Sequence, residues 1–192
     1  EGGATIAWSH YGNIVAQRIT ADGAIAWAQL LVVCDSTGSS HIDADSSGSG
    51  AMVIAWYRSI SGGATVLYAS VVLPDGSLPW GPNGTPTCST AAYWVRPRVI
   101  ADGSGGCYLM WEDQRDFDAL YAQRLDNNGS PLWQQNGIPV RSVPYQQWDF
   151  DLALDFANGN PQGFVAVWVD GRPPTGSAIY AQKVSAQGIA AW

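Results

Sequence analysis

Apolar and polar residues alternate in four segments of the chain that share one pattern. The clearest copy is residues 120–133, LYAQRLDNNGSPLW, and the others are residues 14–27, 67–80 and 179–192. Alternation with a period of two is typical of a β-strand that buries one face. In every copy the alternating residues are followed by a Gly-containing turn and then, a few residues later, by a tryptophan. The pattern therefore predicts four β-hairpins with short second arms that end at Trp.

The turn residues support this interpretation. Asp-Gly and Asn-Gly pairs tolerate positive φ at both central positions and are the strongest short-range hairpin signal. Three of the four turns carry such a pair and the last has Gln-Gly: they are Asp22-Gly23, Asp75-Gly76, Asn128-Gly129 and Gln187-Gly188.

Tryptophans mark a repeat of about fifty residues, the length of a propeller blade. One series ends the hairpins and the other precedes them: Trp27, Trp80, Trp133 and Trp192, then Trp8, Trp56, Trp111 and Trp168. The repeats divide the chain into residues 1–34, 35–88, 89–141 and 142–192. We interpret these tryptophans as packing between blades, since each ring buries a large apolar area.

Each repeat contains four predicted strands, except that the first lacks its innermost one. In the third repeat they are residues 98–101, 107–112, 119–125 and 130–133. Four-stranded sheets repeated in series predict an all-β fold, a β-propeller of antiparallel blades with about four blades visible. Because the first blade is incomplete, we expect a longer parent chain or self-association to complete the ring.

Composition narrows the classes of function. With 46% hydrophobic and 13% charged residues the chain can bury a core. A net charge of −7, with arginines spread singly, leaves no basic face for nucleic acid. The longest apolar run, residues 24–34, is too short to span a bilayer. The three cysteines lack metal-ligand spacing and are expected to be buried apolar residues, with a disulfide or a metal site as the alternative.

Two tryptophans fall outside the repeat register. Trp94 and Trp148 precede predicted innermost strands, where the longer connections should gather near the central axis of one face. Their neighbours include Tyr93, Arg96 and Asp149. Aromatic rings beside Asp and Arg suit a carbohydrate ligand, through ring stacking and hydrogen bonds to hydroxyls. The alternative is that both rings cap a blade junction.

A Trp-x-Asp-x-Arg sequence occurs at the same position in the third and fourth repeats: Trp111, Asp113 and Arg115, then Trp168, Asp170 and Arg172. An acid beside an arginine suggests chemistry. Its recurrence favours a loop-stabilising ion pair instead, worth about 0–1 kcal/mol on an exposed loop. A ligand contact by Arg115 and Arg172 is the alternative.

Candidates for metal binding and catalysis are few. Asp43 and Asp45 alternate in what reads as a Gly-rich turn, the oxygen-rich setting that Ca²⁺ prefers, but a downstream bidentate Glu is missing, so plain turn formation is the alternative. No other cofactor is predicted. There is no nucleophile motif, although a pair of aspartates could serve a glycosidase.

Four segments stand out in the third repeat: residues 97–106 (PRVIADGSGG), 108–115 (YLMWEDQR), 120–125 (LYAQRL) and 131–133 with 136–140. On these segments the repeat resembles the blade repeat of large secreted bacterial β-propeller proteins, most of them of uncharacterised function. The resemblance covers essentially the whole chain and is weaker in the first two repeats. It implies a location outside the cell or at the cell surface, and a scaffold role.

Three functions are compatible with these features. The first is a non-enzymatic extracellular scaffold or adhesion module, with a protein or polysaccharide partner at the cell surface. The second is a lectin-like module that binds polysaccharide through Trp94 and Trp148. The third is a glycosidase or polysaccharide lyase. The first is favoured because the sequence shows no catalytic motif.

Overall fold

The computed structural model describes residues 2–48, 50–60, 63, 65–89, 96–116, 119–141, 146–172 and 176–192. Over these residues the chain forms four antiparallel sheets and one short 3-10 helix. The first sheet contains β1 (Ala4–His10), β2 (Asn13–Ile19) and β3 (Leu31–Cys34); the second contains β4 (Ser39–Ser46), β5 (Met52–Ser59), β6 (Thr65–Val72) and β7 (Thr85–Cys88). The third contains β8 (Arg98–Ala101), β9 (Cys107–Asp113), β10 (Ala119–Leu125) and β11 (Ile138–Arg141), with η1 (Gln114–Asp116) between β9 and β10; the fourth contains β12 (Gln147–Ala157), β13 (Asn160–Asp170) and β14 (Ala178–Ser185).

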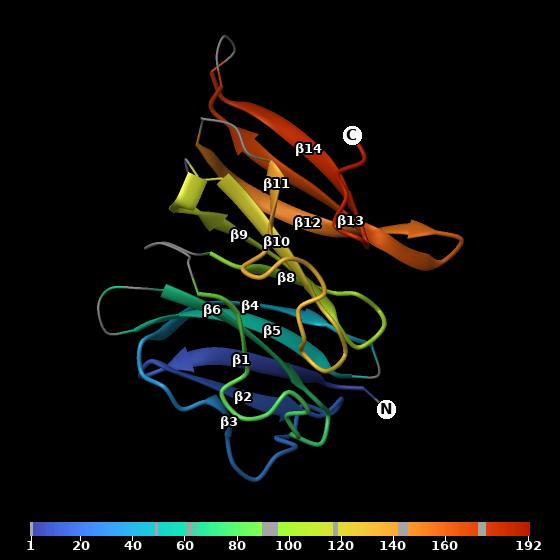
Figure 1. Ribbon diagram of the computed structural model, residues 1–192. Helices are drawn as coiled ribbons and strands as arrows, with labels where there is room; N and C mark the ends of the chain where they lie inside the picture. Colours follow the sequence, from blue (N-terminus) through green and yellow to red (C-terminus); the bar gives the residue numbers. More distant parts are fainter. Residues whose placement is uncertain are drawn as a thin grey trace.

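The sheets resemble propeller blades, which confirms the predicted fold class. Strands follow one another across each sheet in chain order, and the sheets stack in a row with the first and the last at opposite ends (Figure 1). Within the described residues the first sheet lacks the innermost strand, as expected, and the last sheet lacks the outermost one. The innermost strands β4, β8 and β12 therefore lie side by side along one edge of the row.

The outermost strand is not the one that the hairpin pattern predicts. The Gly turns form as expected, with Gly129 N donating to Asp126 O at 3.0 Å. The segment after the turn, however, makes only one bridge, such as Leu125 to Pro131. The chain then leaves the sheet and returns later as β3, β7 or β11. Two of these strands contain a proline, Pro86 or Pro139, which is tolerated because an outer edge strand needs no N–H on its free side.

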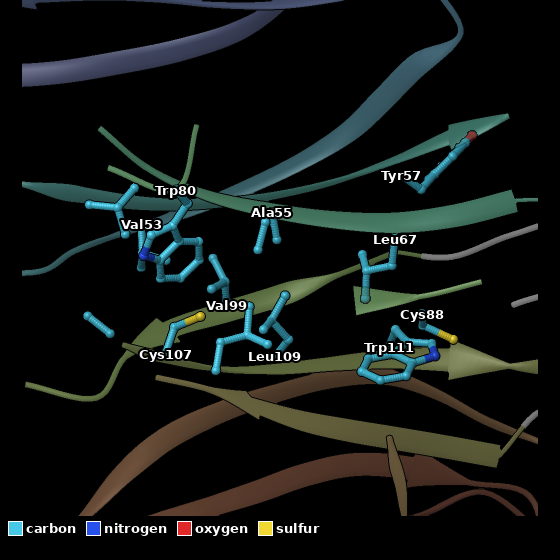
Figure 2. Close-up of a cluster of buried hydrophobic side chains, with 14 of the residues drawn as sticks. Val53, Ala55, Tyr57, Leu67, Trp80, Cys88, Val99, Cys107, Leu109 and Trp111 are labelled. Atoms are coloured by element: carbon cyan, nitrogen blue, oxygen red, sulfur yellow. The ribbon is translucent and has the colours of Figure 1, made fainter. Parts of the chain in front are cut away.

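Three apolar clusters hold neighbouring sheets together. The central one joins Val53, Ala55 and Leu67 of the second sheet to Leu109 and Trp111 of the third (Figure 2). Similar clusters join the first sheet to the second and the third to the fourth. All three cysteines are buried, as the sequence predicts, and none forms a disulfide with another described residue.

The repeat tryptophans pack between sheets, as predicted, except at the two ends of the row. Trp56, Trp111 and Trp168 are buried and face the preceding sheet. At the ends, Trp8 is only half-buried and Trp192 is largely exposed. The packing role therefore depends on a neighbouring sheet being present.

Candidate functional site

Two aspartates of β4 connect it to the neighbouring innermost strand β8. Asp43 and Asp45 lie on β4 itself rather than in a Gly-rich turn, which corrects the expected setting. Asp43 Oδ2 accepts a hydrogen bond from Val99 N at 2.8 Å, and Asp45 Oδ2 accepts one from Ala101 N at 3.0 Å. These N–H groups belong to the free edge of β8, so the two carboxylates satisfy an edge that would otherwise lack partners.

Three charged residues form a line across these strands. Asp43, Arg98 and Asp151 occupy one repeat position on β4, β8 and β12. Arg98 Nη1 lies 3.6 Å from Asp43 Oδ1, and Arg98 Nε lies 3.9 Å from Asp151 Oδ1. Arg98 Nε also donates to Phe150 O at 3.4 Å. We call this set the inner-strand ladder.

The ladder is graded in exposure, with side-chain values of 25% for Asp43, 47% for Arg98 and 74% for Asp151. Burial raises the pKa of the Asp43 carboxyl, and the charge of Asp151 adds to this effect. The Val99 N–H and the Arg98 guanidinium act in the opposite direction and favour the ionised carboxylate. The two neighbours thus keep a partly desolvated charge in place, while Asp151 faces solvent.

A groove of about 310 Å³ follows the ladder. Toward one end, Arg96, Arg98, Glu112, Asp149 and Phe150 line a smaller hollow of about 70 Å³. Toward the other end the groove adjoins a wider hollow of about 520 Å³ whose lining includes Ile100, Leu154, Phe156 and Pro161. The whole surface is therefore charged at one end and apolar at the other.

β-Bulges interrupt two of the innermost strands, and one of them places Asp149 in the charged end. The pairing of β12 with β13 shifts between Trp148 and Asp151, and that of β4 with β5 shifts between Ser40 and Asp43. Within these bulges Asp149 has φ 47° and His41 has φ 49°, left-handed conformations that residues other than glycine seldom adopt. Such local strain is common where a side chain is aimed at a ligand.

The structure brings some of the predicted ligand residues together. Arg96 and Asp149 are exposed and line the same hollow. Trp148 is half-buried, and its ring lies close to Gly171, on which a Cβ would be 3.2 Å from Trp148 Cη2. Tyr93 and Trp94 lie outside the described residues. Trp148 and Asp149 lie within β12 rather than in a connection ahead of it, which corrects the expected setting, and the half-buried Trp148 ring packs at the end of its own sheet.

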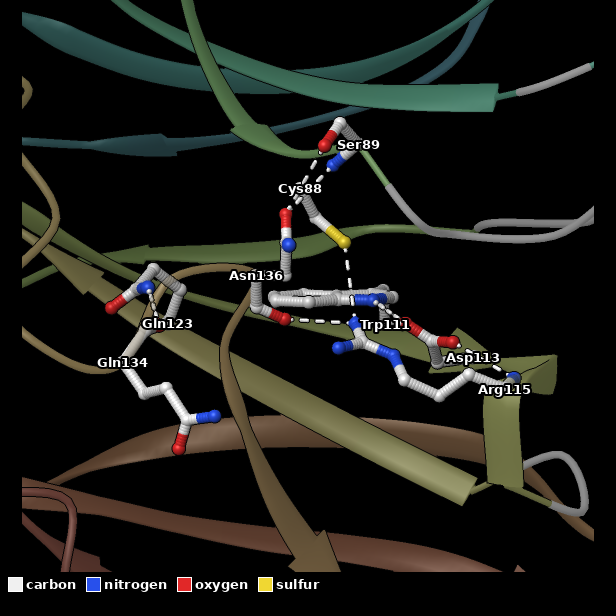
Figure 3. A network of polar contacts seen from close by, with 8 residues as sticks. All are labelled: Cys88, Ser89, Trp111, Asp113, Arg115, Gln123, Gln134 and Asn136. Carbon is white, nitrogen blue, oxygen red and sulfur yellow. Dashed lines mark hydrogen bonds and ion pairs between the residues drawn. The ribbon is translucent and has the colours of Figure 1, made fainter.

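Arg115 and Arg172 form the predicted ion pairs, but in a more buried setting than expected. Asp113 has no exposed side-chain area; it pairs with Arg115 and accepts a hydrogen bond from Trp111 Nε1 at 2.9 Å (Figure 3). The Arg115 guanidinium lies 4.0 Å from the centroid of the Tyr121 ring and donates to Asn136 O at 2.8 Å. Since breaking a buried pair leaves an uncompensated charge, we expect a larger contribution here than the about 0–1 kcal/mol of a surface pair.

The second sheet shows what happens without this motif. Arg58 occupies the position of Asp113, and the buried Trp56 Nε1 has no hydrogen-bond partner among the described residues. Arg58 still covers an aromatic ring, with its guanidinium carbon 4.9 Å from the centroid of Tyr68. The motif therefore gives the N–H of a buried indole a hydrogen-bond acceptor and packs an arginine on a tyrosine.

The described residues contain no group of three or more His, Cys, Asp or Glu side chains that could hold a metal ion, and Asp43 and Asp45 instead accept the backbone hydrogen bonds of β8. In the same part of the chain, no helix has the length and apolar character needed to cross a membrane.

Arg98 and Asp151 are the groove residues that sequence reasoning missed. They share one repeat position with Asp43, two residues after the position shared by His41, Arg96 and Asp149. An alignment of the innermost strands by that register would have exposed alternating charges at a single position. The two tryptophans outside the repeat register indicated the connections ahead of these strands instead.

Comparison with known proteins adds a limited fold resemblance. No family model matches the chain, and no curated protein matches it. A solved structure described as a thermostable family-43 glycoside hydrolase is similar with a TM-score of 0.48 and 12% sequence identity, over 97% of this chain and 73% of that one.

Proposed function

We propose that this protein is a non-enzymatic binding module of a secreted or surface scaffold, and that its inner-strand groove holds a neutral, hydroxyl-rich polymer such as a polysaccharide. The observation that carries the proposal is the inner-strand ladder. Arg98 stands between two carboxylates and remains 47% exposed, and Asp151 remains 74% exposed. Donors and acceptors thus alternate along an open groove, with their positions fixed by three strands.

Alternating donors and acceptors match the chemistry of sugars. A carboxylate can accept hydrogen bonds from two neighbouring hydroxyls, and a guanidinium can donate to hydroxyl or ring oxygens. The apolar end, where Phe156 is 58% exposed, offers a surface for the C–H face of a sugar ring. The ladder and this end together supply the polar and apolar contacts that a carbohydrate site combines.

The charge of the groove favours neutral ligands. Its linings contain five carboxylates and two guanidinium groups, belonging to Asp43, Asp45, Glu112, Asp149 and Asp151 and to Arg96 and Arg98. An anionic polymer would meet a net negative surface, so complementarity selects against it. Binding without catalysis is supported by the engagement of Asp43, whose two carboxylate oxygens face the Val99 N–H and Arg98.

Calorimetric titration with soluble polysaccharides tests the proposal. We expect saturable binding of a neutral polymer from a panel such as dextran and laminarin, and weaker or no binding of alginate and polygalacturonate. Asp151→Asn should weaken the binding at least tenfold, because a charged acceptor becomes a neutral amide whose N–H₂ faces the hydroxyls. Asp35→Asn is the matched control, since Asp35 is exposed and lies outside the groove.

Three results would contradict the proposal. Equal affinity of the wild type and Asp151→Asn would remove the ladder from the binding site, as would a lack of binding to every polymer in the panel. Release of new reducing ends from a bound polymer by the wild type would show that the module is an enzyme after all.

A further inference from the structure

One contact recurs at each junction between neighbouring sheets. The tryptophan that follows each Gly turn reaches the turn of the next sheet and donates from Nε1 to a backbone oxygen there. The three bonds run from Trp27 to Pro74 O at 3.1 Å, from Trp80 to Asn127 O at 2.9 Å and from Trp133 to Ala186 O at 3.2 Å. The indole also lies on the turn glycine: a Cβ on Gly129 would be 2.8 Å from Trp80 Cδ2. We call this contact the tryptophan latch.

The sheets also bury a fixed pair of faces at each junction. We define the forward face of a sheet as the one that the next sheet covers, and the rear face as the one that packs on the preceding sheet. At one forward-face position, Ile14, Leu67 and Leu120 are all fully buried. At one rear-face position, Ile54, Leu109 and Ala166 are all fully buried. The three junctions are thus variants of one interface.

Half of this interface is left uncovered at the last sheet. Ile179 occupies the position of Leu120 and is 81% exposed, and Val167 on the same forward face is 40% exposed. Trp192 occupies the latch position and is 63% exposed. Its backbone is already held, because Gln182 Nε2 donates to Trp192 O. The forward face therefore keeps the arrangement of the internal junctions without a sheet to cover it.

The complementary half is uncovered at the first sheet. Ile6 on the rear face is 46% exposed, although the same position is fully buried in the other sheets. Ile25 is 72% exposed, whereas Leu78 at its position in the second sheet packs against the cluster between the first two sheets. A Cβ on Gly23 would meet nothing within 4 Å, so the turn that should receive a latch has none. Ala21 O, the equivalent of the three latch acceptors, accepts no hydrogen bond in the described structure.

We propose that the forward face of the last sheet binds the rear face of the first sheet of a second copy of this chain. The first sheet of the same copy lies at the far end of the row (Figure 1), so it does not cover this face. In the contact, Trp192 lies on Gly23 of the second copy and donates to its Ala21 O. Lys183 pairs with Asp155 Oδ2 at 2.7 Å and stands where Arg124 donates to Ala186 O beside Trp133, so it places a cation near the same carbonyl.

The contact joins two different faces, so it propagates head to tail into larger assemblies or closes a ring. Sedimentation velocity over a concentration series should show species above the monomer mass of 20.4 kDa that grow with concentration. Ile179→Glu disables the forward face and Ile25→Glu disables the rear face, and each variant alone should sediment as a monomer. Both side chains are exposed, so the variants should fold, and circular dichroism checks that they do. Trp192→Ala gives an independent forward-face variant that leaves the sheet intact.

Mixing the two variants distinguishes this head-to-tail contact from any symmetric contact. Ile179→Glu keeps a working rear face and Ile25→Glu keeps a working forward face, so an equimolar mixture should form one contact and stop at twice the monomer mass. Tyr11→Ser is the control, since Tyr11 is 88% exposed in the turn between β1 and β2, and it should associate like the wild type. A wild type that stays monomeric, a variant that still associates alone, or a mixture that stays monomeric would each overturn the proposal.

Discussion

Removing the carboxylate of Asp170 tests whether the Trp-x-Asp-x-Arg motif stabilises the fold. Asp170 has no exposed side-chain area and pairs with Arg172, whose Nε donates to Asp170 Oδ1 at 3.0 Å. The carboxylate also accepts the Arg172 backbone N–H at 3.1 Å and the Trp168 Nε1–H at 3.4 Å. The Arg172 guanidinium carbon lies 3.9 Å from the centroid of the Tyr180 ring. One carboxylate therefore binds the Arg172 guanidinium, the Arg172 backbone N–H and the Trp168 indole N–H.

Two substitutions separate charge from hydrogen bonding. Asp170→Ala leaves a buried indole N–H without this acceptor and an arginine without its counter-ion, and removal of one partner of a buried pair costs about 3–5 kcal/mol. Because Arg172 is 21% exposed and stays partly hydrated, we expect the lower part of that range, about 3 kcal/mol. Asp170→Asn keeps an acceptor oxygen and should cost about 1–2 kcal/mol.

The stability difference should also depend on pH. Hydrogen bonding from Arg172 holds the pKa of Asp170 below its ordinary value in the folded protein, against the effect of burial. A lowered folded-state pKa contributes stability above the unfolded value of about 3.9, and that stability is lost as the pH falls through the folded-state pKa. The gap between the wild type and Asp170→Asn should therefore be constant near neutral pH and shrink below about pH 4.

Urea unfolding at several pH values measures both effects, with the midpoint followed by tryptophan fluorescence and by circular dichroism. Coincident transitions justify the comparison of free energies. If Asp170→Ala costs no more than a typical exposed pair, about 0–1 kcal/mol, the burial argument is wrong. If the difference in unfolding free energy between the wild type and Asp170→Asn stays constant into acid, the lost stability comes from packing rather than from the ionised carboxylate.

Two further experiments test the repeat interactions by urea unfolding. Gly129→Ala should cost about 2–3 kcal/mol, since its φ of 79° is unfavourable by about 1–2 kcal/mol for alanine and the new Cβ would strike Trp80. Gly23→Ala has a similar φ of 86° but an open turn, so under monomeric conditions it should cost only the about 1–2 kcal/mol of the unfavourable φ. Equal costs for the two variants would show that the tryptophan latch does not contribute to the cost of Gly129→Ala. Arg58→Asp combined with Ile60→Arg installs the motif in the second sheet, gives its buried indole N–H an acceptor, and should raise the unfolding free energy by about 1–2 kcal/mol. A lower urea midpoint for this double variant would mean that the motif depends on its surrounding sheet.

Sequence periodicity was sufficient for the blade-like sheets because strand alternation and Gly turns are local signals. The innermost strand of the third sheet, Arg98–Ala101, and the strand Ala119–Leu125 were predicted at the bounds that the structure has. The outermost strand was misplaced because the Gly turn is a strong local signal for a hairpin. The strand before the turn instead pairs with a later segment, which follows the tryptophan that contacts the next sheet. Four residues with a central proline, as in Thr85–Cys88, give a weak local signal.

The candidate site was less accessible from the sequence because it is built between strands rather than along one. Nothing near Asp43 in the sequence indicates that its carboxylate accepts the N–H of Val99. The same is true of Arg98 and Asp151, which become neighbours only when β8 and β12 lie side by side. Arg96 and Asp149, chosen for their place ahead of an innermost strand, do line one hollow, because that place is fixed by the repeat itself.

Groove and end faces are expected to work independently, and the strand order explains why. The groove needs innermost strands in register, and β4, β8 and β12 supply them. The first sheet has no innermost strand in the described residues. When its rear face covers the last sheet of another copy, it therefore adds no ladder position next to Asp151, and the groove ends at β12. Assembly then multiplies separate grooves, each confined to one chain, so polymer binding per chain should be the same in the monomeric Ile25→Glu variant as in the assembled wild type.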